Sequence, residues 1–358
     1  MKKLCLALVS VFLVLASSEG LLAQLRRGTI KRNNKQIGSF RGKKSGFGKE
    51  KRYNAIGFSV NALNYYGDIA PLPQRVSTDI SFTRPAFGIS LAHRFGPRYT
   101  LQGQFLYGTL SGSDNSAGSA TGESKFRYLR NASFRNRIKE LSVVAYFDLF
   151  ENQSTYISRV KWTPYVFLGF AAFLHNPQAK VPALDLHGNP LPEAGKWVDL
   201  RPLGTEGQYS KLDPSDKNYG IKPYSLLQVA IPFGVGARFR LNEVMDLWGD
   251  IGFRYTFTDY LDDVSRNYVN LYKLNSPLAE AMAYRTNELS PGGQTPPANP
   301  VTYSDPNNPG KTYTVEAGYG QEYKDNNRGN KNNRDVYMVT SIRLTYIVGA
   351  TFHKAKFR

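Results

Sequence analysis

Three acidic residues gather at one point of this 358-residue sequence in a pattern that allows chemistry. They are Asp259, Asp262 and Asp263. Carboxylates at this spacing can bind Ca²⁺, or they can donate and accept protons as catalytic acids. A third interpretation is a turn in an external loop, whose carboxylates accept hydrogen bonds from backbone N–H groups. We prefer the turn and keep the metal site and the acid catalyst as alternatives.

A second group contains the only neighbouring acid and base residues that could catalyse hydrolysis at the external rim of a barrel: His175, Asn176, Asp185 and His187. None of the four histidines lies at ligand spacing from another, and the single cysteine, Cys5, lies inside an apolar run. The sequence has no Gly-rich phosphate loop and no nucleophile motif. It therefore predicts no catalytic residue, cofactor or metal, and we expect a protein that is not an enzyme.

The elements that would position these residues are β-strands, because apolar residues alternate with polar or small ones. In 226–239, for example, Leu227, Val229 and Ile231 alternate with Gln228 and Ala230. Strands of soluble sheets mostly have about five or six residues, whereas a strand that crosses a bilayer needs about nine to eleven. The predicted strands have 11 to 14 residues and are 54–64, 85–95, 98–108, 138–150, 162–174, 226–239, 246–257 and 336–348.

The connections between these strands alternate between long and short. The long ones are 65–83, 110–135, 175–225 and 258–335. Bacterial outer-membrane barrels have this arrangement, with short periplasmic turns and long external loops. The sequence predicts an all-β chain with a single transmembrane antiparallel β-barrel of about eight strands over 54–350, both termini lying in the periplasm. The two longest loops could hide another hairpin, which would give ten strands. A soluble sandwich or lipocalin-like cup explains the alternation alone.

An eight-stranded barrel is filled by its own side chains. The charged residues expected inside carry both signs and could neutralise one another: Arg94, Glu140, Asp148, Arg238, Asp250, Arg254 and Arg343. Aromatic residues near the turns predict an interfacial girdle: Phe95, Tyr99, Phe150, Trp162, Tyr165, Phe239 and Trp248. In the last long loop we predict a helix from Pro277 to Glu288, with Ser276 as its N-cap.

The two ends of the chain carry most of its positive charge. Residues 1–23 have the layout of an export signal, with Lys2 and Lys3 before an apolar run. Residues 24–53 hold 11 Lys and Arg and one Glu, and residues 351–358 hold three basic residues. We expect both segments to be periplasmic, and 24–53 to be a flexible tail that binds an acidic partner or an anionic wall polymer rather than nucleic acid. The tail residues proposed for partner binding are Arg26, Arg27, Lys31, Arg32, Arg41, Lys43, Lys44, Lys49, Lys51 and Arg52.

Several segments between 54 and 348 carry a likeness to a known family. They include Asn64-Tyr65-Tyr66-Gly67-Asp68, Arg130-Asn131-Ala132-Ser133-Phe134, 202–208 with Gly204, Thr205 and Glu206, 256–265 with the three acidic residues, and Arg328-Gly329-Asn330. The chain resembles the PorG-like outer-membrane proteins of the Bacteroidota, which are tied to the type IX secretion and gliding apparatus. The resemblance implies a non-enzymatic outer-membrane subunit that contacts the periplasmic ring of the machine, with lipid around it and no small-molecule substrate. An adhesin or binding barrel, or a rim-located hydrolase, is the alternative.

Overall fold

The computed structural model describes residues 47–48, 51–69, 83–117, 120–122, 124–289 and 295–349. The chain divides into two units, 1–48 and 49–358. The predicted signal at 1–23, the C-terminal segment 351–358 and all proposed partner-binding residues except two lie outside the described residues. Those two are Lys51, which is partly buried, and Arg52, which is exposed. Among the described helices, none combines the length and apolar character needed to cross a bilayer.

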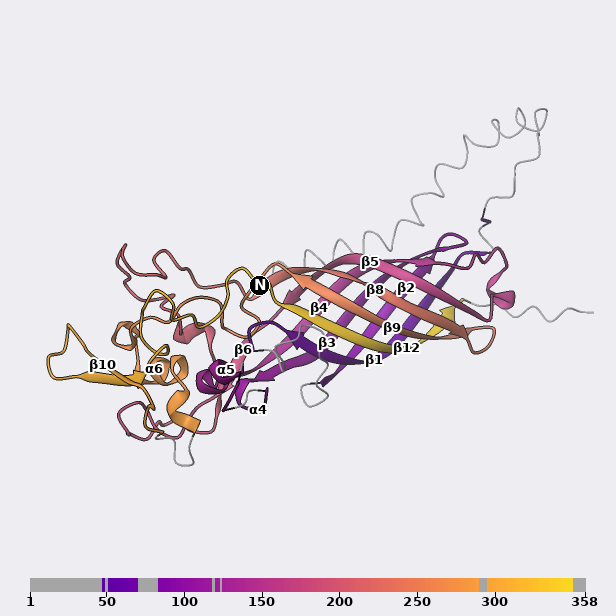
Figure 1. Ribbon diagram of the computed structural model, residues 1–358. Coiled ribbons are helices and arrows are strands. Elements are labelled where there is room, and N and C mark those ends of the chain that lie inside the picture. The colour runs from indigo at the N-terminus through magenta and orange to yellow at the C-terminus, as the bar shows by residue number, and fades with distance from the viewer. Residues whose placement is uncertain are drawn as a thin grey trace, which may run out of the picture. The chain divides into compact units, whose positions relative to one another are not determined.

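Eight long strands form a closed antiparallel barrel (Figure 1). Each strand pairs with its neighbours along the chain, and β12 closes the sheet by pairing with β1. The predicted fold is therefore confirmed, with eight strands and not ten. The strands are β1 (Tyr53–Tyr66), β2 (Arg84–Arg94), β3 (Tyr99–Ser113), β4 (Ser133–Asp148), β5 (Trp162–Leu174), β8 (Leu227–Arg240), β9 (Met245–Thr256) and β12 (Val336–Val348).

The remaining elements lie in the connections. Two short strands add to the sheet at the loop end of β4: β6 (Pro177–Lys180) pairs with β4, and β7 (Trp197–Asp199) pairs with β6. A separate hairpin is formed by β10 (Pro300–Ser304) and β11 (Thr312–Glu316). The helices are α4 (Asp114–Ala117), α5 (Lys125–Arg130), α6 (Pro277–Ala283) and the 3₁₀-helices η5 (Tyr156–Ser158), η6 (Arg201–Leu203), η7 (Leu271–Lys273) and η8 (Thr286–Leu289).

The predicted helix in the last long loop begins at Pro277, where the Ser276 side chain accepts a hydrogen bond from Ala279 N at 3.1 Å. It ends at Ala283, before the predicted Glu288, and η8 follows it. The N-terminal part of the prediction is therefore right and the length is wrong.

The described parts of the long connections lie at one end of the barrel and the short connections at the other (Figure 1). We call the described parts of 67–69, 114–132, 175–226 and 257–335 the loop cap. The loop cap has an apolar core of its own, which includes Tyr268, Leu271, Tyr284 and Tyr313. It is therefore a packed structure and not a set of loose loops.

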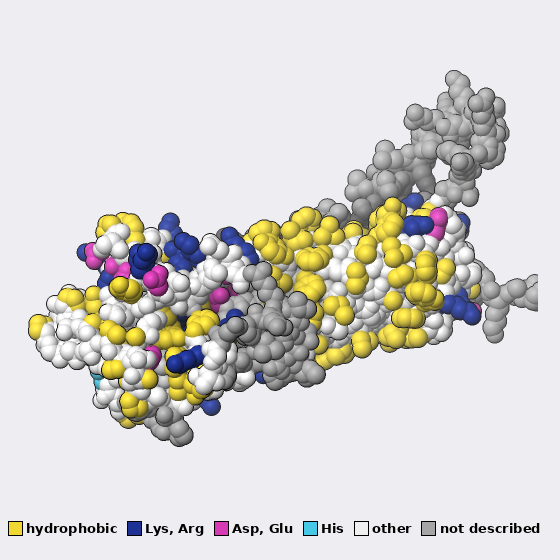
Figure 2. Space-filling view, in the orientation of Figure 1, with side chains coloured by type: hydrophobic (Ala, Val, Ile, Leu, Met, Phe, Trp, Pro, Cys, Tyr) yellow, Lys and Arg dark blue, Asp and Glu magenta, His cyan; other side chains and the backbone are white. Residues whose placement is uncertain are grey.

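The outward face of the barrel is apolar. The large apolar side chains exposed on the strands are called here the apolar belt, and Figure 2 shows in yellow those on one face of the barrel. Lipid offers no hydrogen-bond partners, so a spanning sheet must close on itself and present apolar side chains outward. The exposed belt residues are Ile56, Phe58, Val60, Phe87, Ile89, Leu91, Leu101, Phe105, Leu141, Val143, Val166, Leu168, Phe170, Val229, Phe233, Val235, Ile251, Ile342 and Leu344.

Five of the predicted girdle aromatics are exposed near the short turns: Phe95, Tyr99, Phe150, Trp162 and Phe239. The prediction was wrong for Tyr165 and Trp248, which are buried inside the barrel. Both carry a polar group that finds a partner there. The Tyr165 hydroxyl donates to Asp250 at 3.0 Å, and Trp248 Nε1 donates to Thr345 Oγ1 at 3.0 Å. An aromatic side chain with a polar tip can face either the membrane interface or the lumen. The alternation of inward and outward positions along each strand decides that these two face the lumen.

The barrel lumen is filled by side chains. Tyr146, Tyr165, Phe167 and Trp248 pack in one cluster, and a larger apolar cluster that includes Leu106 and Ile138 continues into the loop cap. All seven charges expected inside are buried in the lumen. Their ion pairs are Arg94–Asp148 at 2.8 Å, Arg238–Asp148 at 2.5 Å, Arg254–Glu140 at 3.5 Å and Arg343–Asp250 at 2.8 Å.

Candidate functional site

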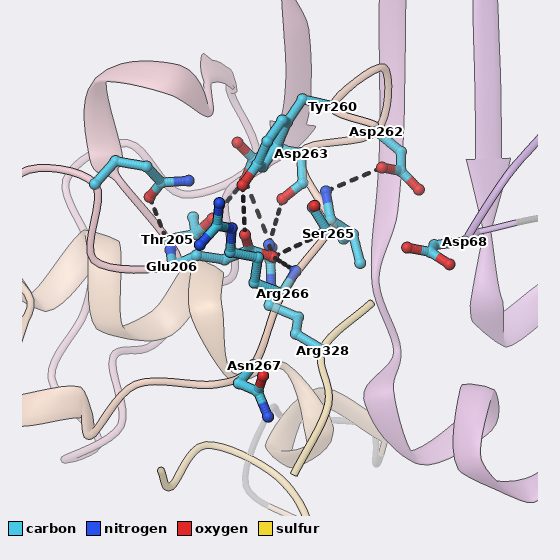
Figure 3. Close-up of polar contacts among 12 residues, drawn as sticks. Asp68, Thr205, Glu206, Tyr260, Asp262, Asp263, Ser265, Arg266, Asn267 and Arg328 are labelled. Carbon is cyan, nitrogen blue, oxygen red and sulfur yellow. Dashed lines mark hydrogen bonds and ion pairs between the residues drawn. The ribbon is translucent and has the colours of Figure 1, made fainter. Parts of the chain in front are cut away.

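The candidate site is a buried polar cluster in the loop cap, where segments far apart in the sequence meet (Figure 3). Asp68 follows β1, Thr205 and Glu206 follow η6, and residues 259–263 follow β9. Arg328 comes from the segment before β12. Most buried polar groups in proteins are hydrogen-bonded, so the partners of each side chain in such a cluster decide what it does.

Glu206 is the central acceptor of the cluster. Its carboxylate accepts hydrogen bonds from the backbone N–H groups of Ser265 at 2.8 Å and Arg266 at 3.1 Å. The guanidinium of Arg328 donates to it at 3.1 Å, and the Tyr260 hydroxyl at 3.2 Å. Glu206 is 0% exposed, so these four donors replace water completely. Glu206 thereby fixes the chain direction after β9.

Asp263 is the second partner of Arg328, with 3.5 Å between the guanidinium and the carboxylate. It also accepts from Thr205 Oγ1 at 2.5 Å and from the Tyr224 hydroxyl at 2.7 Å. Its φ of 68° is unusual for a residue other than glycine and costs roughly 1–3 kcal/mol. Burial raises the pKa of Asp263 to about 6 in spite of the nearby Arg328 charge.

Asp262 and Asp335 share one phenol. The Tyr65 oxygen lies 2.8 Å from Asp262 Oδ2 and 2.7 Å from Asp335 Oδ1. Tyrosine has a single O–H, so one of the two carboxyl groups must hold a proton and donate it to the phenol oxygen. Consistently, burial raises the pKa of Asp262 to about 8, and burial and the charge of Asp262 raise the pKa of Asp335 well above its usual range. A Cβ on Gly67 would lie 1.9 Å from this phenol oxygen, so glycine is required there.

Arg130 ties the cluster to the end of β3. Its guanidinium pairs with both Asp114 oxygens, at 2.7 and 2.8 Å, in a bidentate geometry. Its remaining N–H groups donate to the carbonyl oxygens of Asp68 and Arg328, each at 2.7 Å. Arg130 is 3% exposed, and it joins three separate loops into one unit.

Asp259 differs from its neighbours because neither carboxylate oxygen has a hydrogen-bond partner among the described residues. It is 4% exposed. Burial and the charges of Asp68, Asp262 and Glu206 together raise the pKa of Asp259 to about 9. Asp259 is therefore protonated in the folded loop cap at neutral pH.

This protonation makes the loop cap sensitive to pH. An unfolded Asp has a pKa of about 3.9, so its raised folded value gives stability that is complete below pH 4 and lost as the pH rises through about 9. We expect Asp259→Asn to stabilise the loop cap at pH 9 by on the order of 2 kcal/mol, because it removes an unpaired buried charge. Hydrogen-exchange protection factors for 258–266, taken at pH 5 and pH 9, measure the effect.

The exposed Asp325, also in the loop cap, provides the matched control, as Asp325→Asn removes the same charge without a buried site. Protection that falls equally between pH 5 and pH 9 in the wild type and in Asp259→Asn would contradict the assignment.

Asp262 makes the contacts that the turn interpretation predicts. Its carboxylate accepts hydrogen bonds from the backbone N–H groups of Ile69 at 3.1 Å and Val264 at 2.9 Å. Within the described ranges, His, Cys, Asp and Glu side chains form no group of three arranged to hold a metal ion. The three acidic residues do not act alike: Asp262 binds backbone, Asp263 binds hydroxyl groups and Arg328, and Asp259 is unpaired.

The residues considered for hydrolysis are used in structural contacts. Both ring nitrogens of His175 are occupied, by Asn136 at 3.3 Å and by the Ser225 carbonyl at 3.1 Å, and burial lowers its pKa to about 4. Asp185 accepts from the N–H groups of His187 and Asn189 and closes a turn. The His187 ring packs on another loop residue, Tyr313. No hydrogen bond in the described part of the chain joins the His175 and His187 rings.

Sequence reasoning missed the residues that link the cluster, which are Tyr65, Asp114, Arg130, Arg328 and Asp335. Three of them, Tyr65, Arg130 and Arg328, stand in the segments that carry the family likeness, and that position was the available signal. Of the predicted loop motif, Thr205 and Glu206 enter the cluster directly, whereas Gly204 supplies a turn at φ 61°.

A polar cavity of about 690 Å³ lies beside the cluster. Its lining includes Asp68, Arg130, Ser265, Arg266 and Arg328, together with Phe126 and Tyr319. Phe126 is 46% exposed, so an aromatic face is available at this cavity. The arrangement suits recognition of a polar group.

Comparison with known proteins gives a family match over part of the chain. A family model described as a domain of unknown function, DUF6089, matches residues 46–182. No curated protein matches the chain.

Solved outer-membrane proteins are similar at low identity. OprG of Pseudomonas aeruginosa has 10% identity and a TM-score of 0.33 over 86% of this chain and 100% of its own. A major outer membrane protein of Thermus thermophilus has 11% identity and a TM-score of 0.32 over 82% and 99%. Ail, the attachment invasion locus protein of Yersinia pestis, has 7% identity and a TM-score of 0.29 over 83% and 97%. These values support no inference about function, and the barrel assignment stands on the strand pairing described above.

Proposed function

We propose that this protein is a non-enzymatic outer-membrane barrel that anchors a structured docking surface and serves as a subunit of the type IX secretion machinery. The filled lumen supports an anchor rather than a channel. The loop cap, which has its own core and its own buried polar cluster, supports a binding role for the loops.

One observation carries the proposal. The segments that resemble the PorG-like family lie far apart in sequence, yet 64–68, 130–134, 202–208, 256–265 and 328–330 all contribute to the polar cluster or its links. The residues in these segments thus maintain the shape of the loop cap, as expected where a partner recognises that shape. They do not line a channel through the barrel.

The proposed orientation places the loop cap outside the cell and both chain ends in the periplasm. The basic residues of 24–53 would then face the periplasmic ring of the machine, where they could bind an acidic surface.

Gene deletion tests the proposal directly. We expect the null strain to retain inside the cell those proteins that carry the machine's C-terminal signal, and a plasmid copy of the gene to restore their secretion. A copy without residues 24–50, which ends before β1, should insert in the membrane but recover less ring protein in co-purification. Normal secretion in the null strain would reject the proposal.

A second candidate is an adhesin or binding barrel. The polar cavity favours it, as do the exposed loop-cap tyrosines Tyr209, Tyr219 and Tyr323. Binding of intact cells to host or glycan surfaces separates the candidates. Cells that display a chain with these three tyrosines changed to Ser should lose adhesion only if this second candidate is right.

A further inference from the structure

A stripe of positive charge interrupts the apolar belt on the outward face of β4. From the short-turn end toward the loop cap, the outward positions of β4 read Val143, Leu141, Lys139, Arg137 and Arg135. Lys139 and Arg137 are exposed, and Arg135 is partly exposed. We call these last three residues the basic stripe.

The basic stripe begins among lipid-facing side chains. Lys139 is the register partner of Tyr107 on β3 and of Leu174 on β5, and these two neighbours are 44% and 45% exposed. Leu141, two residues from Lys139 on the same face, is 51% exposed and belongs to the apolar belt. The basic stripe therefore runs from the edge of the apolar belt that is nearer the loop cap, at Lys139, toward the loop cap, at Arg135.

The charges of the basic stripe have no internal compensation. No described carboxylate forms an ion pair with Arg135, Arg137 or Lys139, and the side chains of Arg137 and Lys139 have no polar partner in the described ranges. This contrasts with the lumen, where all four predicted arginines pair with a carboxylate. An unpaired cation at the edge of a bilayer is stabilised by the anionic headgroups of lipids.

Arg135 is held in place at the top of the stripe. Its guanidinium lies 4.0 Å from the centre of the Trp197 ring on β7, and its Nε donates to Gln178 on β6 at 3.0 Å. Gln178 donates in turn to Asp199, the nearest acidic partner in this group. Lys180, exposed on β6, adds a fourth cation beside Trp197, its register partner. Tryptophan is enriched at the level of lipid headgroups.

We propose that the basic stripe, with Lys180 and Trp197 above it, binds the phosphate of a lipid in the leaflet at the loop-cap end. With the loop cap outside the cell, this lipid is the phosphorylated lipid A of lipopolysaccharide. Lys139 extends its ammonium along its apolar stem toward the headgroup, and the planar fork of Arg137 suits a phosphate. The inference rests on the proposed orientation of the barrel and not on its role in secretion.

Direct lipid binding tests this site in the full-length protein. In detergent micelles, diphosphoryl lipid A should bind the wild type, and the triple variant Arg135→Gln, Arg137→Gln and Lys139→Gln should bind it at least about tenfold more weakly. The control variant Lys211→Gln, Lys222→Gln and Lys324→Gln removes the same charge from exposed positions of the loop cap and should bind like the wild type. Native mass spectrometry measures both.

Two further arms fix the source of the phosphate. Lipid A without its phosphates should bind no better to the wild type than to the triple variant, and inorganic phosphate at equal phosphate concentration should not displace lipid A. The exchange variant Arg137→Lys with Lys139→Arg should retain binding, which shows that the triple variant loses charge and not fold. Equal lipid A binding by the triple variant and the wild type, or displacement by free phosphate, would overturn the proposal. Neither result would bear on secretion, which the null strain tests separately.

Discussion

Replacing Arg328 by Met should unfold the loop cap while the barrel stays in the membrane. The change leaves Glu206 and Asp263 buried together without their shared cation. Removing one partner of a buried ion pair costs about 3–5 kcal/mol, because the remaining charge cannot be solvated. Hydrogen exchange of 258–269 and of 326–330 should lose its protection, whereas the strands should keep theirs.

Arg266 offers a matched control for Arg328. It is adjacent to the cluster and partly exposed, and no ion pair of its side chain occurs in the described part of the chain. Arg266→Met removes the same charge and should preserve protection. Adding Glu206→Gln and Asp263→Asn to Arg328→Met should restore part of the protection, since the uncompensated charges are then gone. Equal protection in the Arg328→Met and Arg266→Met proteins would contradict the role given to Arg328.

The Asp148→Ala protein should be less stable as a barrel by about 3–5 kcal/mol. Asp148 is the carboxylate between two buried guanidinium groups, those of Arg94 at 2.8 Å and Arg238 at 2.5 Å, and it is 0% exposed. Its loss would leave two buried guanidinium groups without the carboxylate with which they both form an ion pair. Urea unfolding of the protein in lipid vesicles, followed by the mobility shift of folded barrels on cold gels, measures the change.

The exposed pair of Arg98 and Glu151 provides the contrast. Its atoms are 3.9 Å apart, and both side chains are more than a third exposed. Exposed ion pairs contribute about 0–1 kcal/mol, so Glu151→Ala should leave the unfolding midpoint nearly unchanged. If the two variants unfold at the same urea concentration, the lumen charges are not the structural pairs described here.

The sequence was sufficient to predict the barrel because its two signals are local. Alternation with period two fixes which residues face lipid, and the contrast between short and long connections fixes the up-and-down order of the strands. The parity of each strand also placed the seven lumen charges. Parity was overlooked only for Tyr165 and Trp248, where the position near a turn was taken as the stronger signal.

The polar cluster could not be predicted in the same way, because its contacts join residues that no local pattern connects. Tyr65 and Asp335 are 270 positions apart, and Arg130 and Arg328 are 198 apart. Loop residues have no periodicity from which a direction can be inferred. The acidic residues 259, 262 and 263 were recognised as a group, but their three different roles depend on partners supplied by other loops.

Ion conductance tests the central claim, which is that side chains fill the barrel and the protein acts as an anchor for the loop cap. Full-length protein in a planar lipid bilayer, with insertion verified by protection of the strands from protease, should give no steady current in 1 M KCl. A reproducible open-channel conductance from the wild-type protein would contradict the account.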